Sequence, residues 1–303
     1  MQNLLLASSG FLLATAAAAA AAANVYDESV FRRLTPAEVR RELRVNDAPE
    51  YAFKNFSDAY VKRALATSVS WVEKGAVTPV KDQGPHGYCG TFGRVGNAEG
   101  QWVLRGGGNL TSFSEEELID CVGWSLDQFA FFSVKGFMTS EAYPYNETAY
   151  PDQNPPIPGN PCRYSAASTV MGTPGYFNAS TGRAPDEDQL AAFILHNGPV
   201  AAGINADVFG LRAKGCEASG SCFITKAECA QVAQDIDHSI VVVGYGTDAV
   251  NGPYWLIKNS WSTNFANGGY INVARGINCA GLCGDPSICG NVFAHGDPAS
   301  YFE

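Results

Sequence analysis

The chain has 303 residues, of which 46% are hydrophobic and 17% charged, as is typical of a globular protein with a sizeable buried core. Thirty acidic side chains against 20 basic ones give a formal charge of −10. This balance argues against a nucleic-acid partner, because the chain lacks the basic surface that displaces counterions from phosphate.

Residues 1–23 are typical of a secretory signal peptide. The apolar run LLLASSGFLLAT leads into alanines 16–23, small residues that suit signal-peptide cleavage. A membrane anchor is the alternative interpretation, and no later stretch reaches the roughly 18 apolar residues that a span needs. We therefore expect a secretory route that ends in a lysosome or vacuole or outside the cell, with no membrane span after signal cleavage.

Cysteine content and glycosylation triplets agree with this route. Nine cysteines fit an oxidising compartment, and their odd number leaves one thiol outside any set of pairs. Four Asn-x-Ser/Thr triplets are predicted glycosylation acceptors, at Asn55, Asn109, Asn146 and Asn178.

Three helices are predicted in the first half. Residues 24–66 are polar and lack cysteine, and Thr35 followed by Pro36 predicts a helix over 35–45. A second helix is predicted over 89–105, although its glycines cost about 1 kcal/mol each relative to alanine, so packing must hold it. Ser114 followed by Glu117 predicts a capping box that opens the third helix.

The second half predicts strands. The runs PVAAGI, SIVVVGYG, YWLIKNSW and GGYINVAR are rich in Val, Ile and Tyr and favour an antiparallel sheet or barrel. Between the halves, YPDQNPPIPGNPC contains five prolines and is predicted to be a loop. Helices followed by strands predict an α+β chain with two lobes, and the cleft between lobes is a natural place for a site.

Four residues in this order suggest thiol chemistry. Cys89 begins the second predicted helix, and a helix N-terminus favours a thiolate. His238 follows 149 residues later and Asn259 another 21, the order expected for a nucleophile, its base and the group that orients the base. Alone, each has an ordinary structural interpretation, as a disulfide half, a core histidine or a strand-end amide. Gln83, which has an amide side chain, lies six residues before Cys89 and completes this set of four.

Several motifs resemble papain-like cysteine proteases of the cathepsin L type. VSWVEKGAVTPVKDQG, SFSEEELIDC, YPY, DHSIVVVGYG, YWLIKNSW and GGY occur in the order of that family, from about residue 68 to 276. The resemblance implies a peptidase domain over 67–303, with a helical lobe over 67–175 and an antiparallel β-barrel-like lobe over 176–303. It further implies that residues 24–66 are a short propeptide that inhibits the enzyme.

Carried over by position, the resemblance implies Cys89 as nucleophile, His238 as general base and acid, Asn259 as orienter of the imidazole, and Gln83 as oxyanion donor. The implied enzyme is a monomer that hydrolyses peptide bonds in protein and peptide substrates without a cofactor or metal.

Supporting residues are implied in the same way. Trp261 would shield the hydrogen bond between Asn259 and His238, and Tyr88 and Ser239 would support the substrate groove. Cys121 and Cys162 stand where the family has a disulfide.

The surroundings of Cys89 depart from the family pattern Cys-Gly-Ser-Cys-Trp. Here the chain has His86, Tyr88 and Gly90 at the changed positions, and the glycine-rich loop that holds the partner of the absent cysteine is missing. Two alternatives therefore stay open: a catalytically weakened homologue with a binding or regulatory role, and an acyl-transfer enzyme of the transglutaminase-like class.

Six further cysteines lie in the second half, and their pairing is left open, with metal binding as the alternative to disulfides. They are Cys216, Cys222, Cys229, Cys279, Cys283 and Cys289.

Overall fold

A computed structural model of the chain describes residues 50–51, 54–123, 128, 131–132, 135–146, 162–171, 175–177, 186–211, 216, 222–282, 292–294 and 298–301. All of them belong to one compact unit, Leu34–Glu303, and the other unit, Met1–Arg33, lies outside the described residues. The predicted signal peptide, the helix expected over 35–45, most of the proline-rich loop, Asn178, Cys283 and Cys289 also lie outside them.

The described helices are α3 (Asp58–Leu65), α4 (Cys89–Leu104), α5 (Glu115–Cys121), α7 (Glu187–Asn197), α8 (Asp207–Gly210) and α10 (Lys226–Cys229), with 3-10 turns η3 (Ala166–Ser168), η5 (Cys279–Gly281) and η6 (Pro298–Tyr301). The strands are β1 (Glu50–Tyr51), β2 (Val69–Ser70), β3 (Phe137–Met138), β4 (Thr169–Met171), β5 (Gly175–Phe177), β6 (Val200–Ile204), β7 (Phe223–Ile224), β8 (His238–Asp248), β9 (Gly252–Lys258), β10 (Tyr270–Ala274) and β11 (Val292–Ala294).

Strand β8 is the centre of the main sheet. It pairs antiparallel with β6, β9 and β2, and β9 continues the sheet through β10 to β7. The four predicted strands are therefore confirmed, and they pair antiparallel with one another. Strand β7, which was not predicted, adds to the edge of the sheet and runs parallel to β10. Strand β2 comes from the start of the expected helical lobe, and its Val69 lies opposite Tyr245 of β8.

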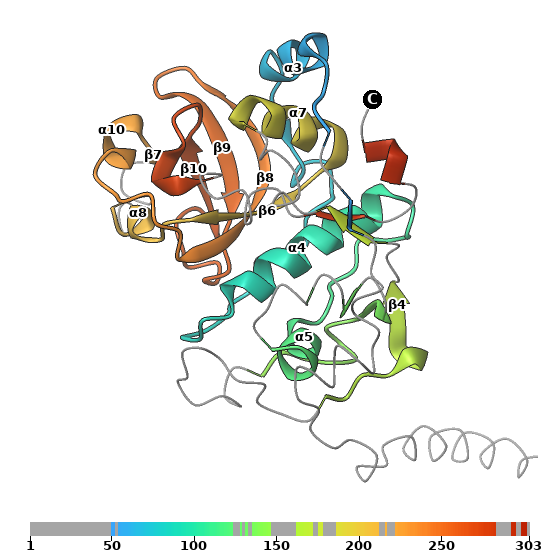
Figure 1. Ribbon diagram of the computed structural model, residues 1–303. Coiled ribbons are helices and arrows are strands. Elements are labelled where there is room, and N and C mark those ends of the chain that lie inside the picture. Colours follow the sequence, from blue (N-terminus) through green and yellow to red (C-terminus); the bar gives the residue numbers. More distant parts are fainter. Residues whose placement is uncertain are drawn as a thin grey trace, which may run out of the picture. The chain divides into compact units, whose positions relative to one another are not determined.

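Helix α4 lies between the main sheet and α5 (Figure 1). Its glycines permit this close approach: a Cβ added at Gly96 would lie 2.9 Å from Val241 Cγ2, and one at Gly100 2.9 Å from the Pro199 ring. The glycines cost helix propensity, but they let α4 pack directly against β8, which confirms that tertiary packing holds this helix.

Two large hydrophobic cores flank α4. One gathers buried side chains of β6, β8, β9, β10 and α7, among them Trp255 and Phe193. The other gathers Val95 of α4, Leu118 of α5 and phenylalanines of the following segment. One core thus lies around the main sheet with α7 packed against it and the other around α4 and α5, and the predicted α+β class is confirmed.

Three disulfides join described cysteines. The predicted pair Cys121–Cys162 is confirmed. Of the six cysteines whose pairing was left open, four form two bridges, Cys216–Cys222 and Cys229–Cys279.

The start of α5 corrects one prediction. Ser114 is the N-cap, and its hydroxyl accepts a hydrogen bond from the Glu117 backbone N–H at 3.0 Å. The reciprocal bond of a capping box does not form, because the Ser114 N–H donates to the Met138 carbonyl. The Glu117 carboxylate accepts from the Met138 N–H instead, so this glutamate ties α5 to β3.

Candidate active site

One cavity of about 510 Å³ brings together residues that lie far apart in the sequence. Its lining includes Gln83, His86 and Cys89 from the first half of the chain and Asp237, His238 and Trp261 from the second half. Cys89 and His238 are the first residues of α4 and β8, and the other four lie on loops, where binding and catalytic residues are often found.

Cys89 is the first residue of α4 and is half-buried. Among the described cysteines it carries the thiol that is outside any disulfide. Burial raises the pKa of this thiol, while the backbone N–H groups of Ser239 and Gly90 and the charge of Arg94 act in the opposite direction. The side chain that must ionise to react is thus partly desolvated, with backbone dipoles and a cation placed to stabilise its anion.

His238 is the first residue of β8 and is buried. Its Nε2 lies 2.8 Å from Asn259 Oδ1, and because a carbonyl oxygen accepts, the ring donates its Nε2 hydrogen. This fixes Nδ1 as the ring nitrogen outside the bond to Asn259. Burial lowers the pKa of His238, opposed by the bond to Asn259 and by the Asp237 carboxylate.

Aromatic rings cover the imidazole. The ring of Trp261 lies 4.7 Å from that of His238, and Phe209 of α8 contacts both rings edge-on. Asn259 is 2% exposed, so its bond to His238 is removed from water. Removal from water strengthens this hydrogen bond, whereas the buried Asn259 Nδ2 has no hydrogen-bond partner among the described residues.

Gln83 is buried at the rim of the cavity, on the loop before α4. Its Nε2 donates to the His86 carbonyl at 2.7 Å, and its Oε1 accepts from the Ser260 hydroxyl at 2.6 Å. A primary amide carries two N–H hydrogens, so one donor of Nε2 remains beyond the bond to His86. The two bonds fix the plane of the amide beside Cys89.

The other predicted support residues lie elsewhere. Tyr88 is 2% exposed and packs with Phe92, Ile119 and Tyr145 below the helix start. Burial, with nearby carboxylates of α5, raises the pKa of Tyr88 to about 12. The side chain of Ser239 faces α4, where its Oγ would lie 2.5 Å from a Cβ at Gly93. Both residues therefore support α4 rather than line the cavity.

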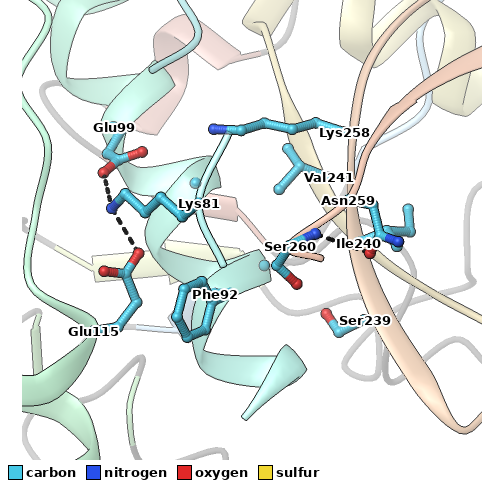
Figure 2. A pocket seen from close by; sticks show the side chains of 12 residues that line it. Lys81, Phe92, Glu99, Glu115, Ser239, Ile240, Val241, Lys258, Asn259 and Ser260 are labelled. Carbon is cyan, nitrogen blue, oxygen red and sulfur yellow. Dashed lines mark hydrogen bonds and ion pairs between the residues drawn. The ribbon is translucent and has the colours of Figure 1, made fainter. Parts of the chain in front are cut away.

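A buried charged cluster beneath the site was not foreseen from the sequence. Lys81 Nζ lies 2.7 Å from Glu99 of α4 and 2.6 Å from Glu115 of α5, as Figure 2 shows. Burial opposes the charge of Lys81, but Glu115 and Glu99 outweigh it and hold its pKa above the ordinary value. The ammonium thus links the loop that carries Lys81 to both α4 and α5.

Lys258, at the end of β9, completes this cluster. Its Nζ donates to the carbonyl and hydroxyl of Thr78, and the Thr78 hydroxyl in turn donates to Glu99. Burial lowers the pKa of Lys258 to about 8, although the Glu99 carboxylate opposes the shift. Because Asn259 is the next residue, the cluster anchors the chain segment that holds the imidazole.

Two general features bear on location and modification. Asn55, Asn109 and Asn146 are exposed and remain predicted glycosylation sites. Within the described ranges, no helix is long and apolar enough to cross a membrane.

The α+β fold thus forms a cavity that is lined by a thiol at the start of a helix and an imidazole at the start of a strand. The sequence profile of the family described as "Papain family cysteine protease" matches residues 65–289. The chain belongs to this family.

Individual relatives agree. Procathepsin L of Felis catus is 35% identical over 227 residues, which are 70% of this chain and 61% of the relative. Cathepsin S of Mus musculus is 34% identical over 247 residues, covering 76% of this chain and 64% of the relative. The solved structure of digestive procathepsin L 3 from the larval midgut of Tenebrio molitor has a TM-score of 0.64 at 28% identity, covering 93% of this chain and 90% of that one. The chain spans less than two thirds of the length of both curated relatives.

Proposed function

We propose that this chain is a cysteine endopeptidase that hydrolyses peptide bonds through a thioester on Cys89. The observation that carries the proposal is the shared cavity of Cys89 and His238, with the imidazole oriented by its 2.8 Å bond to Asn259. A nucleophile, a base and a group that orients the base are the components of acyl transfer.

The reaction follows from these positions. The Cys89 thiol passes its proton to His238, and the sulfur attacks the peptide carbonyl carbon. The oxyanion that forms accepts hydrogen bonds from the remaining N–H of Gln83 Nε2 and from the backbone N–H of Cys89, which as a first helical residue has no intrahelical partner. His238 then gives its proton to the leaving amine as the C–N bond breaks. Water, deprotonated by His238, hydrolyses the thioester and restores the thiol.

The proposal also covers the substrates, the location and the inhibition of the enzyme. Substrates are proteins and peptides, and the secretory route leads to a lysosome or vacuole or out of the cell. Residues upstream of the peptidase domain act as an inhibitory propeptide. One feature is compatible with an acidic setting: burial raises the pKa of Glu117, so that low pH favours the folded state.

The decisive experiment is labelling of the processed protein by an epoxide-type cysteine-protease inhibitor, followed by mass spectrometry of the peptide that contains Cys89. Digestion of a peptide library by the same preparation, beside Cys89→Ala, reports cleavage and specificity. We expect one adduct on Cys89 and cleavage that is lost in Cys89→Ala.

A matched asparagine pair controls this test. Asn259→Ala should lower kcat/KM by about 100-fold, since the imidazole loses its orienting bond, whereas Asn264→Ala at an exposed position should leave it within about twofold. Burial of the Cys89 thiol, which raises its pKa, favours one second candidate, a binding protein with an unreactive thiol. Absence of both adduct and cleavage would contradict the peptidase proposal.

A further inference from the structure

Helix α3 and the residues just before it belong to the same core as the main sheet. Phe56, Tyr60 and Ala64 are 4%, 7% and 0% exposed and lie in the core that contains Phe193 and Trp255. They recur every four residues, so they form one face of α3 and of the turn that leads into it. The family profile begins at residue 65, the last residue of this helix.

We propose that residues 56–66 are a permanent part of the folded peptidase and stay covalently attached when upstream residues are removed. The mature chain then begins at or before Phe56, instead of at the boundary of residues 66 and 67 expected from the sequence. The inference assumes that upstream residues are removed from the chain, and in this it rests on the proposed function. Its evidence is the packing of α3.

The first contacts that hold this segment are with α7. The Phe56 N–H donates to Gln189 Oε1 at 2.8 Å, and Gln189 Nε2 donates back to the Phe56 carbonyl at 3.2 Å. Both hydrogen-bonding groups of the Phe56 backbone are thus satisfied by one side chain, in the manner of a strand partner. Further along, the hydroxyl of Tyr60 lies 3.3 Å from His196 Nδ1. Figure 1 shows α3 lying beside α7.

The second set of contacts is with β8, the strand that begins with His238. The Tyr245 hydroxyl, which is buried, donates to the Ala64 carbonyl at 2.9 Å. Removal of the segment would leave this hydroxyl without its acceptor and would uncover the apolar surface beneath Phe56 and Tyr60. Leaving a buried donor unsatisfied and deleting core aromatic rings are both strongly destabilising.

The link between α3 and β2 offers a protease little extended backbone. Residues 66–68 are exposed, but α3 ends at Leu65 and β2 begins at Val69. The Ala66 and Thr67 N–H groups donate to the Lys62 and Ala64 carbonyls, which continues the helical turn. Cleavage here requires local opening of a segment anchored on both sides, and such opening has a free-energy cost.

Segment 56–66 is also placed for a structural role instead of an inhibitory one. The cavity around Cys89 is lined by residues 83–87, 89, 206, 237, 238 and 261. Helix α3 packs instead on α7, which belongs to the hydrophobic core of the sheet. Inhibition by occupancy of the site therefore belongs to residues upstream of Phe56.

The test uses the full chain carrying Cys89→Ser, which cannot cut itself, digested briefly with pepsin at acidic pH. N-terminal sequencing and intact mass of the resistant product should give a start at or before residue 56. A start between residues 66 and 69, with or without a co-purifying fragment, would overturn the proposal. Because this variant needs no activity, the result holds whether or not the proposed peptidase function is correct. Wild-type protein labelled on Cys89 should have the same start.

Point variants in the same Cys89→Ser chain provide a second measurement. Phe56→Ala and Tyr60→Ala should each lower Tm by on the order of 10 °C, because each removes a core aromatic ring. The control Lys62→Ala lies on the exposed face of α3 and should change Tm by about 1 °C or less. Equal Tm values for all three variants would show that α3 is only loosely attached and would contradict the proposal.

Discussion

Ser260 and Gln83 hold each other through two hydrogen bonds across 177 residues of sequence. The Ser260 hydroxyl donates to Gln83 Oε1 at 2.6 Å, and the Gln83 N–H donates to the Ser260 carbonyl at 2.9 Å. The Ser260 N–H also donates to Asn259 Oδ1, the atom that orients His238. One serine therefore positions both the proposed oxyanion donor and the amide that holds the base.

Ser260→Ala should lower kcat/KM by about tenfold, mainly through kcat, because the Gln83 amide keeps its bond to His86 but can rotate about it. This loss is smaller than the about 100-fold or more that removal of an oxyanion donor costs. Steady-state hydrolysis of a peptide substrate measures it. Thr263→Ala, at an exposed position three residues further on, is the control and should match wild type. An unchanged kcat in Ser260→Ala would show that Gln83 needs no second anchor.

Glu117 should make the fold more stable in acid than in base. Burial raises the pKa of Glu117 to about 8, and its Oε1 has no hydrogen-bond partner among the described residues. The ordinary pKa of a glutamate carboxyl is 4.5, and the pKa of Glu117 in the folded chain is higher. Below pH 4.5 this group therefore contributes its full stabilisation to the folded state, and the contribution is lost as the pH rises through about 8.

Glu117→Gln keeps an acceptor for the Met138 N–H and cannot ionise. The fall in unfolding free energy between pH 5 and pH 8 should therefore shrink by on the order of 4 kcal/mol. Denaturant melts at the two pH values measure this difference in the inactive Cys89→Ser chain. Glu141→Gln, at an exposed position, should leave the pH dependence as it is in the parent. Equal slopes for both variants would place the titration elsewhere.

Lys81→Met should destabilise the fold by about 3 kcal/mol or more. The change leaves the buried carboxylates of Glu99 and Glu115 without the cation that lies between them, and an uncompensated buried charge is costly. Chemical denaturation at neutral pH measures the loss, which should diminish in acid as the carboxylates protonate. Lys226→Met, on the exposed start of α10, is the matched control. A loss below about 1 kcal/mol would mean that the cluster contributes little.

Gly100→Ala should destabilise the fold by about 1–3 kcal/mol, although alanine is the better helix former. The new Cβ would lie 2.9 Å from the Pro199 ring and 3.2 Å from the Ala76 carbonyl, neither of which can rotate away. Thermal melts compare it with Gly210→Ala, where the added methyl group meets open space and stability should be unchanged or slightly higher. A more stable Gly100→Ala would show that α4 can move away from the sheet.

Much of the fold was predictable, because the sequence patterns that indicate it lie within single elements or occur in the order of the papain-like family. Helix α4, the long strands and the pair Cys121–Cys162 are of this kind. The parallel strand β7 was missed because a two-residue strand has no periodicity to detect. Of the two hydrogen bonds of the predicted capping box, the one from the Glu117 N–H to the Ser114 hydroxyl forms. The other does not, because the Met138 N–H, a tertiary partner, donates to the Glu117 carboxylate instead.

The site divides in the same way. The sequence motifs single out Cys89, His238, Asn259 and Gln83. The structure places Cys89, His238 and Gln83 in one cavity, and Asn259 is hydrogen-bonded to His238. Ser260 and the cluster around Lys81 were not found, because charged and hydroxyl residues so far apart in sequence look like ordinary surface. Their partners come from separate elements, and only the folded chain brings them together.

The separation of Cys89 and His238 along the chain also sets the time that passes between the synthesis of the two residues. Synthesis proceeds at about 5–20 residues per second, so the intervening 149 residues take roughly 7–30 s to make. Throughout that interval the emerging thiol lacks His238, and the cavity walls from Ala206, Asp237 and Trp261 are incomplete. The order of residues along the chain therefore means that the proposed catalytic pair cannot form until most of the chain has been translated.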